Sequence, residues 1–298
     1  MTMSKQGIDI SYCQTNVDYN KLKASGVEFV IIQAGYGRDV SQKDKMFETH
    51  YAGCKAAGIK VGAYWYSYAV SEADAVQEAQ ACLNAIKGKQ FEYPIYYDVE
   101  EQSQFNKGKA FCDSITKAFL SRLEASGYYA GLYTGRYAAQ NYFSQATLDR
   151  YALWIAEYGG KLNYTGKYGM WQNSSEWVVS GISSGVDHDY CYVDYPKLIK
   201  YGGYNGYKKP TPKPSVKVLD KKGYVKGDST IGVYAFKLHL IRAKELGIVK
   251  QGVKADKKFG EGTEKATNEL LKKWGYKQTG IAGENLIKRL GEELRKMK

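Results

Sequence analysis

The chain has 298 residues, of which 44% are hydrophobic and 25% charged, and this composition excludes an intrinsically disordered protein. Its apolar runs are far shorter than the roughly 18 residues that a membrane-spanning helix needs, so no membrane insertion is expected. The net charge of +12 lies wholly in residues 208–298, which hold 23 Lys and Arg against 10 Asp and Glu, whereas residues 1–207 hold 20 against 21.

Short runs rich in Tyr, Val and Ile alternate with helical patterns along the first two thirds of the chain. The runs are nearly continuously apolar, which is typical of strands that are buried on both faces. We predict strands at residues 7–11, 29–34, 61–68, 94–100, 130–134, 153–158, 168–172 and 186–190. We predict helices at residues 19–25, 46–57, 71–86 and 109–126, the third of them capped by Ser71.

Eight strands separated by helical spacers predict an α/β fold, a parallel (β/α)8-like barrel with outer helices over residues 1–200. The last two connections are short and irregular, so the final helices are expected to be reduced or absent. An open, doubly wound sheet shares the same alternation of strands and helices. The barrel is favoured because eight strands are present and no Gly-rich phosphate loop follows the first.

A change of composition marks a second domain. Residues 201–215 are rich in Gly, Tyr, Pro and Lys and predict a semi-rigid linker. Residues 216–298 predict a small all-α domain of three helices, at residues 233–246, 263–274 and 285–297. The positive charge of this domain predicts attraction to a polyanion, such as nucleic acid, anionic lipid or an acidic wall polymer, with a merely solvated basic surface as the alternative.

Five cysteines and three histidines are present, and none of them indicates a reactive or metal-binding site. No CxxC pair occurs, and Cys54, Cys82 and Cys112 are expected to pack as small hydrophobic side chains on helices. No cluster offers the three or four ligands of a zinc site, so we expect neither a metal nor a cofactor. The first residues contain no apolar signal segment, which predicts a cytoplasmic, reducing site of synthesis.

The main chemical signal is a pair of acids, Asp98 and Glu100, at the end of the fourth strand. Residues two apart on a strand point the same way, and the carboxyl ends of barrel strands form the catalytic rim. Like charge and partial burial raise the pKa of one carboxyl group, which can then donate a proton, as a glycosidase requires. A solvated pair of surface acids is the alternative, but the apolar residues before them argue against it.

Two further acids lie inside predicted strands that a closed barrel makes neighbours. Asp9 belongs to the first strand and Asp187 to the eighth. An unpaired buried charge is costly, so such acids indicate function. The alternative is a structural role at a helix N-terminus or beside a basic side chain, and this is the role that we expect for Asp189.

Aromatic and amide side chains near the strand ends are candidates for saccharide binding, because the apolar faces of sugar rings stack on aromatic rings. Tyr66 and Trp171 are the leading candidates for a groove. Periodicity alone does not separate groove aromatics from core aromatics. The other candidate substrate-binding residues are Tyr64, Tyr133, Gln33 and Gln172.

In their order along the chain, these motifs resemble the muramidases of glycoside hydrolase family 25, the lysozyme type used by many phage endolysins. The matching segments are GIDIS (7–11), GAYWY (62–66), YDVE (97–100), LWIA (153–156), MWQ (170–172) and VD (186–187). The resemblance covers residues 5–200 and implies hydrolysis of the β-1,4 bond from N-acetylmuramic acid to N-acetylglucosamine in bacterial peptidoglycan. Such an enzyme is made in the bacterial cytoplasm and acts on the cell wall after release.

The resemblance also implies roles for the acids. Glu100 is the general acid/base, and Asp98 stabilises the positive centre of the transition state or acts as the nucleophile. Asp9 and Asp187 complete the acidic cluster. Asp189 departs from the family, in which a neutral residue often stands near the second carboxylate. A covalent route and a route assisted by the substrate's acetamido group both stay open.

Residues 230–295 resemble the three-helix peptidoglycan-binding module that is fused to many wall hydrolases. Two features depart from it: Lys257 stands where the module commonly has Gly, and Leu271 to Lys273 replace an aromatic–Gln pair. The resemblance therefore implies the fold but not the ligand-binding residues. A basic domain that binds an anionic wall polymer would raise the local concentration of the enzyme at its substrate.

Three other functions stay open. The barrel could cleave another polysaccharide such as chitin, or be a catalytically inactive, lectin-like wall-binding module. The basic domain could bind nucleic acid, which normally requires aromatic side chains interleaved with Lys and Arg. Nucleic acid is not expected, because the few aromatic residues of this segment have the spacing of a core.

Overall fold

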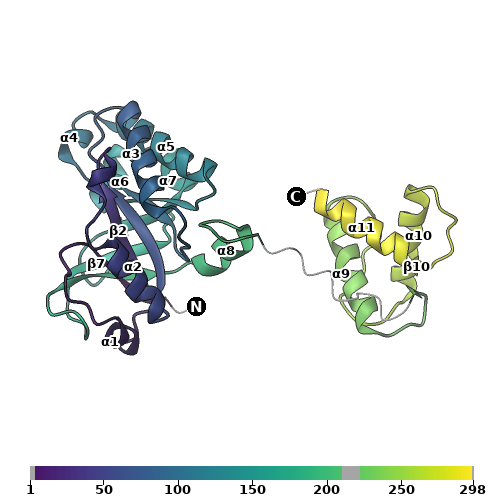
Figure 1. The fold of residues 1–298 in the computed structure, drawn as a ribbon. Helices are drawn as coiled ribbons and strands as arrows, with labels where there is room; N and C mark the ends of the chain where they lie inside the picture. Colours follow the sequence, from purple (N-terminus) through teal and green to yellow (C-terminus); the bar gives the residue numbers. More distant parts are fainter. Residues whose placement is uncertain (1–3, 210–221, 297–298) are drawn as a thin grey trace. The chain divides into compact units, whose positions relative to one another are not determined.

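The structure, a computed structural model, describes residues 4–209 and 222–296. The chain divides between residues 210 and 211 into two compact units (Figure 1). Each unit has its own hydrophobic core, and each is described by itself below.

The first unit is a closed barrel of eight strands that follow one another around the barrel in sequence order. Neighbouring strands from β1 to β7 are parallel, whereas β8 is antiparallel to both β7 and β1. The strands are β1 (Lys5–Ile10), β2 (Phe29–Tyr36), β3 (Lys60–Tyr66), β4 (Ile95–Asp98), β5 (Ala130–Gly135), β6 (Ala152–Ala156), β7 (Met170–Trp177) and β8 (Val186–Cys191).

The predicted barrel is thus confirmed, but the expectation that all of its strands are parallel is wrong for β8. Residues 178–185 join β7 to β8 and contain no helix, and neither do residues 157–169 between β6 and β7. The predicted reduction of the last helices is therefore confirmed. A parallel crossover needs about a dozen residues or more, so the short connection returns β8 in the opposite direction.

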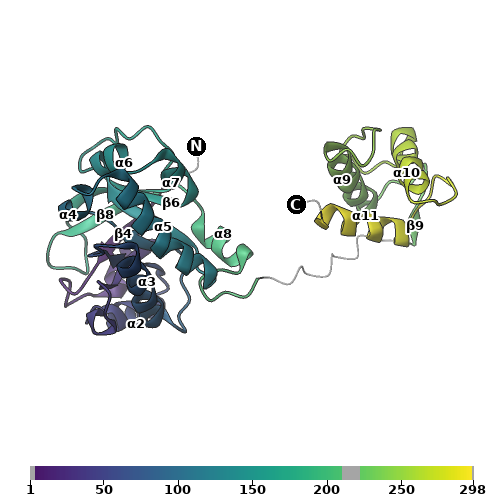
Figure 2. The same cartoon turned by 90° about the horizontal axis from the view of Figure 1, so that it is seen from above.

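Helices cover the outside of the barrel, and α3 and α5 lie side by side there (Figures 1 and 2). Ser71 caps α3, its side chain accepting a hydrogen bond from the Asp74 amide, as predicted. The helices are α1 (Tyr19–Ala24), α2 (Phe47–Ala56), α3 (Glu72–Ile86), α4 (Gln102–Phe105), α5 (Lys109–Ala125), α6 (Arg136–Tyr142), α7 (Gln145–Arg150) and α8 (Tyr195–Gly202), with a short 3-10 helix, η1 (Val40–Gln42).

Alternating side chains of the strands fill two layers. Outward-facing residues pack beneath the helices together with Cys54, Cys82 and Cys112, all buried as expected. Inward-facing aromatic residues fill the barrel, where Phe29 and Tyr93 stack at 4.4 Å between ring centroids. The packed interior leaves the carboxyl ends of the parallel strands as the place where polar side chains gather.

Part of the predicted linker belongs to the barrel unit. Helix α8 extends to Gly202, and the side chain of the buried Asn205 donates to the carbonyl oxygens of Phe91 and Tyr93. Tyr207 also hydrogen-bonds Glu92. Composition marks this segment as a linker, but its polar groups satisfy main-chain groups of the barrel that would otherwise lack partners. Residues 210–215 lie outside the described residues.

The second unit contains the three helices α9 (Ile231–Glu245), α10 (Glu261–Lys273) and α11 (Glu284–Lys296). Two short strands, β9 (Gly223–Tyr224) and β10 (Ala282–Gly283), pair antiparallel and were not predicted. Phe236, Leu240 and Leu270 are fully buried in its core. In the described part of the chain, no helix is both long and apolar enough to cross a bilayer.

Candidate active site

A group of acids lies at the carboxyl end of the parallel strands. Asp9 lies in β1, Asp98 ends β4, and Glu100 follows two residues later. Because β8 is antiparallel, its first residues reach this rim, and Asp187 lies directly opposite Asp9 in the register of the two strands. The barrel thus brings the four acids predicted from the sequence to one end.

Asp9 is held by a hydrogen-bond relay inside the barrel. Gln172 Nε2 donates to Asp9 Oδ2 at 2.8 Å, and the Tyr133 hydroxyl donates to Gln172 Oε1 at 2.8 Å. All three side chains are buried. Gln172 and Tyr133, predicted as substrate-binding residues, therefore already have hydrogen-bond partners within the protein.

No basic side chain compensates these acids among the ion pairs of the described residues. Burial, followed by the charge of Asp187, raises the pKa of Asp9 well above its usual value. Burial also raises the pKa of Asp187, to about 6. Carboxylates this close cannot all ionise freely, so the cluster retains protons at higher pH than isolated acids do.

Asp98 and Glu100 differ in their access to solvent. Asp98 is buried, its Oδ1 has no hydrogen-bond partner among the described residues, and burial and then the charge of Glu100 raise its pKa well above the usual value. Glu100 is exposed at the rim, but protein atoms crowd its carboxyl group, and this partial desolvation with the charge of Glu101 raises its pKa. Glu100 therefore combines a raised pKa with access to a bound molecule.

Asp189 has a different partner from the one expected. It is fully buried, and the Trp154 indole donates to its Oδ1 at 2.7 Å, instead of a helix N-terminus or a basic side chain. Burial, followed by the charge of Asp9, raises its pKa well above the usual value. Asp189 thus lies below the rim and interacts with the cluster through Asp9.

The predicted groove residues do not all reach the acids. Tyr64 and Gln33 are paired in register on β3 and β2. Burial and then the charge of Asp9 raise the pKa of Tyr64, which lies close to that acid. Trp171 faces the outside of β7, since its neighbours Met170 and Gln172 point inward, and its indole donates to the Glu157 carbonyl at 2.8 Å. Strand alternation separates Trp171 from Gln172, and this signal was already present in the sequence.

Two tyrosines at the rim, Tyr68 and Tyr36, were missed, and they lie next to Tyr66, which was predicted. The Tyr66 hydroxyl donates to Glu101 at 2.7 Å, and its ring lies 5.0 Å from that of Tyr68. Tyr68 in turn packs edge-on against Tyr36 at 6.0 Å, and both are substantially exposed. Tyr68 continues the two-residue spacing of Tyr64 and Tyr66, which is the signal that could have identified it.

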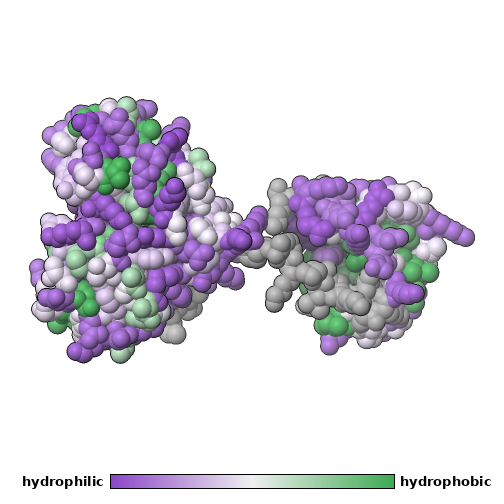
Figure 3. Space-filling view, viewed as in Figure 1, coloured by the Kyte–Doolittle hydropathy of each residue, from purple (hydrophilic) through white to green (hydrophobic). Residues whose placement is uncertain are grey.

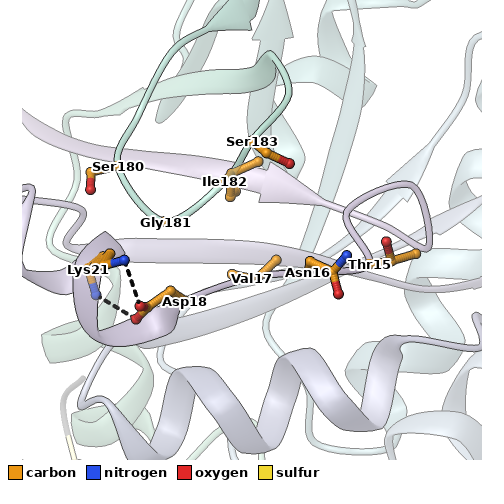
Figure 4. Close-up of a pocket in the computed structure, with 9 residues that line it drawn as sticks. All are labelled: Thr15, Asn16, Val17, Asp18, Lys21, Ser180, Gly181, Ile182 and Ser183. Atoms are coloured by element: carbon orange, nitrogen blue, oxygen red, sulfur yellow. Dashed lines mark hydrogen bonds and ion pairs between the residues drawn. The ribbon is translucent and has the colours of Figure 1, made fainter.

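A pocket of about 630 Å³ lies apart from the acids, between the loop that follows β1 and the loop that joins β7 to β8 (Figure 4). Asp18 and Lys21 in this pocket already form a mutual ion pair at 3.5 Å. None of the clustered acids lines the pocket, so we do not assign it the chemistry. Among the described residues, no three His, Cys, Asp or Glu side chains are arranged to hold a metal ion.

A closed barrel whose rim gathers uncompensated carboxyl groups with raised pKa values defines the class of carbohydrate-cleaving hydrolases. The family "Glycosyl hydrolases family 25" matches residues 8–182. The chain belongs to this family. The autolytic lysozyme of Clostridium acetobutylicum is 34% identical over 190 residues, which are 62% of this chain and 55% of that protein.

Solved structures agree with this assignment. The CTP1L endolysin is 31% identical, with a TM-score of 0.57 over 66% of this chain and 69% of that one. The modular autolysin LytC from Streptococcus pneumoniae, in complex with a synthetic peptidoglycan ligand, is 26% identical, with a TM-score of 0.59 over 64% of this chain and 47% of that one. The chain spans about half the length of the curated lysozyme.

Proposed function

We propose that this chain is a lysozyme that hydrolyses the β-1,4 bond between N-acetylmuramic acid and N-acetylglucosamine in bacterial peptidoglycan. The observation that carries the proposal is the group Asp9, Asp98, Glu100 and Asp187, gathered at one end of the barrel without a compensating cation. The lysozyme and endolysin similarities reported above support the same substrate class.

In this mechanism Glu100 donates its proton to the oxygen of the leaving sugar, because it combines a raised pKa with solvent access. Asp98 then stabilises the positive charge that develops at the sugar carbon, or attacks it directly. Glu100, now ionised, accepts a proton from the water that completes the hydrolysis. When they are ionised, Asp9 and Asp187 make the local potential more negative, which favours both the protonated acid and the cationic centre.

Mass analysis of the fragments released from purified peptidoglycan tests this proposal. New reducing ends on muramic acid are the expected result. Reducing ends on glucosamine, or freed peptides without glycan cleavage, would contradict it. Digestion of chitin at the same rate would show that the enzyme has no specificity for muramic acid.

We propose further that the second unit attaches the enzyme to an anionic polymer of the cell wall. Hydrophilic residues cover much of its visible described surface (Figure 3). The Arg289 guanidinium lies 4.8 Å from the Trp274 ring and donates to the Tyr276 hydroxyl at 3.1 Å. Four lysines near these residues in sequence have no ion-pair partner among the described residues: Lys272, Lys273, Lys277 and Lys288.

This corner combines cations with aromatic faces, a combination that suits a polymer of sugars and acidic groups. Binding to purified wall should fall steeply with salt and with prior removal of acidic wall polymers. Binding that survives both treatments would contradict the proposal. Tighter binding to DNA than to wall at the same salt concentration would favour a nucleic-acid partner instead.

A further inference from the structure

A buried carboxylate outside the acid cluster has no place in the mechanism above. Glu78 lies on α3 and is 1% exposed. Its Oε2 accepts a hydrogen bond from the Tyr97 hydroxyl at 2.6 Å, and its Oε1 accepts one from the Tyr68 amide at 2.8 Å. A carboxylate buried this deeply without a cation requires such hydrogen-bond donors. The donors therefore identify the parts of the protein that Glu78 holds in place.

The hydrogen bonds form a chain with one direction. Gln104 Nε2 donates to Ser67 Oγ at 2.8 Å, and Ser67 Oγ donates to the Tyr97 hydroxyl at 2.7 Å. Tyr97 donates to Glu78 in turn. Burial raises the pKa of Glu78 to about 7, and above that pH Glu78 is a carboxylate that can only accept, so it sets the orientation of both hydroxyl groups. All four side chains in this chain of hydrogen bonds are buried.

This chain of hydrogen bonds holds in place the segment that carries Asp98 and Glu100. Tyr97 directly precedes Asp98, and Gln104 lies on α4, just after Glu100. The Ser67 amide donates to the Asp98 carbonyl at 3.0 Å, and Gln104 Nε2 also lies 3.1 Å from the Ala69 carbonyl. The segment is therefore held on both sides of Glu100 by the loop that follows β3.

We propose that Glu78 is a positioning residue, which through Tyr97, Ser67 and Gln104 fixes Asp98 and Glu100 in the geometry needed for catalysis. The proposal rests on the proposed function of these two acids. Reacting groups must be placed to within about an ångström, because a displacement of that size can cost about 100-fold in rate. Glu78 touches no substrate in this role.

Glu92 provides a matched control. It is also a buried glutamate, it accepts from the Val61 amide at 3.1 Å, and it pairs with Lys55 at 2.7 Å. It precedes β4, whereas the acids lie at the other end of that strand. The two glutamates therefore share burial and hydrogen bonding but differ in what they hold.

The test compares Glu78→Gln with Glu92→Gln in the full chain at pH 7.5. An amide replaces one acceptor oxygen by a donor, which faces a donor in either site. We expect Glu78→Gln to lower kcat at least tenfold with KM changed less than twofold, on soluble peptidoglycan oligomers. Glu92→Gln should lower the unfolding temperature while leaving kcat within twofold of the parent value.

Tyr97→Phe removes only the hydroxyl that links Glu78 to Ser67, and it carries the test should Glu78→Gln not fold. It should reproduce the loss of kcat, and the double variant should be no slower than the slower single one. Unchanged kcat in Glu78→Gln or Tyr97→Phe, or an equal loss in Glu92→Gln, would overturn the proposal. The kcat of each variant is compared with that of the parent enzyme on the bond that the parent enzyme cleaves. A wrong assignment of that bond would therefore appear separately, in the masses of the released fragments.

Discussion

The pKa values of buried acids are shifted in opposite directions at the two ends of the barrel. At the amino end, burial alone would raise the pKa of Glu92, but Lys55, Tyr207 and the Val61 amide lower it below its usual value. At the carboxyl end, Asp9, Asp98 and Asp187 have no cation partner among the described residues, and burial first and the charges of neighbouring acids second raise their pKa values. An acid paired with a cation supports the fold, whereas buried acids without a cation partner retain protons for chemistry.

The largest effect on activity is expected when the proton donor at the carboxyl end is removed. We expect Glu100→Gln to lower kcat by about 100- to 10,000-fold, the usual contribution of a general acid/base. Sedimentation with purified wall should show unchanged binding, because Gln has nearly the same size and shape as Glu. The control is Glu72→Gln, an exposed glutamate at the start of α3, which should retain full activity. Near-normal lysis by Glu100→Gln would show that another residue is the acid.

Removal of an acid at the amino end should affect stability only. Glu92→Gln is expected to lower the free energy of unfolding by about 1–3 kcal/mol at pH 7, because Lys55 loses a charged partner. The folded pKa of Glu92 is lowered, so its stabilisation is present above the unfolded pKa and is lost as pH falls through the folded value. Urea titrations at pH 7 and pH 3 should therefore show a smaller difference at pH 3. A constant difference would contradict the ion-pair explanation.

At the carboxyl end of the barrel, the pH dependence of stability is expected to have the opposite sign. Asp187 has a folded pKa of about 6, above its usual value of 3.8, so the stability linked to it is present below the unfolded pKa and is lost as pH rises through about 6. Asp187→Asn should therefore stabilise the fold at pH 7.5, by about 1 kcal/mol, while lowering activity. At pH 3.5 the two proteins should unfold at nearly the same temperature. Destabilisation at pH 7.5 would show that Asp187 is not strained by its neighbours.

The smallest effect per residue is expected in the second unit. Replacement of Lys272, Lys273 and Lys277 together by Ala should weaken wall binding several-fold and flatten its salt dependence, because exposed charges act over about a Debye length of 10 Å. Hydrolysis of soluble oligomers should not change. Lys222→Ala, also in the second unit, is the control for loss of a single positive charge. Unchanged binding would place the polymer elsewhere on the unit.

Much of the site was predictable from local pattern. The two-residue spacing of Asp98 and Glu100 predicted that both acids lie at the carboxyl end of the fourth strand, although β4 ends at Asp98 and Glu100 lies just beyond it. Asp9 and Asp187 stand out as acids among apolar neighbours. The alternation of side chains along a strand places Trp171 away from Gln172, although its aromatic character favoured the groove. The Glu78 contacts were not predictable, because Glu78 and Tyr97 lie 19 positions apart on elements that only packing brings together.

The sequence by itself determined the eight strands, the four barrel helices α1, α2, α3 and α5, and the acids that the strands carry, because apolar periodicity and isolated charges are local properties. Helices α4, α6, α7 and α8 were not predicted. Only the tertiary structure decided that β8 runs antiparallel and presents Asp187 at its beginning, opposite Asp9. It also decided that residues up to Tyr207 belong to the barrel. Direction, register and pKa depend on which distant groups approach one another and exclude water, and no local pattern encodes that distance.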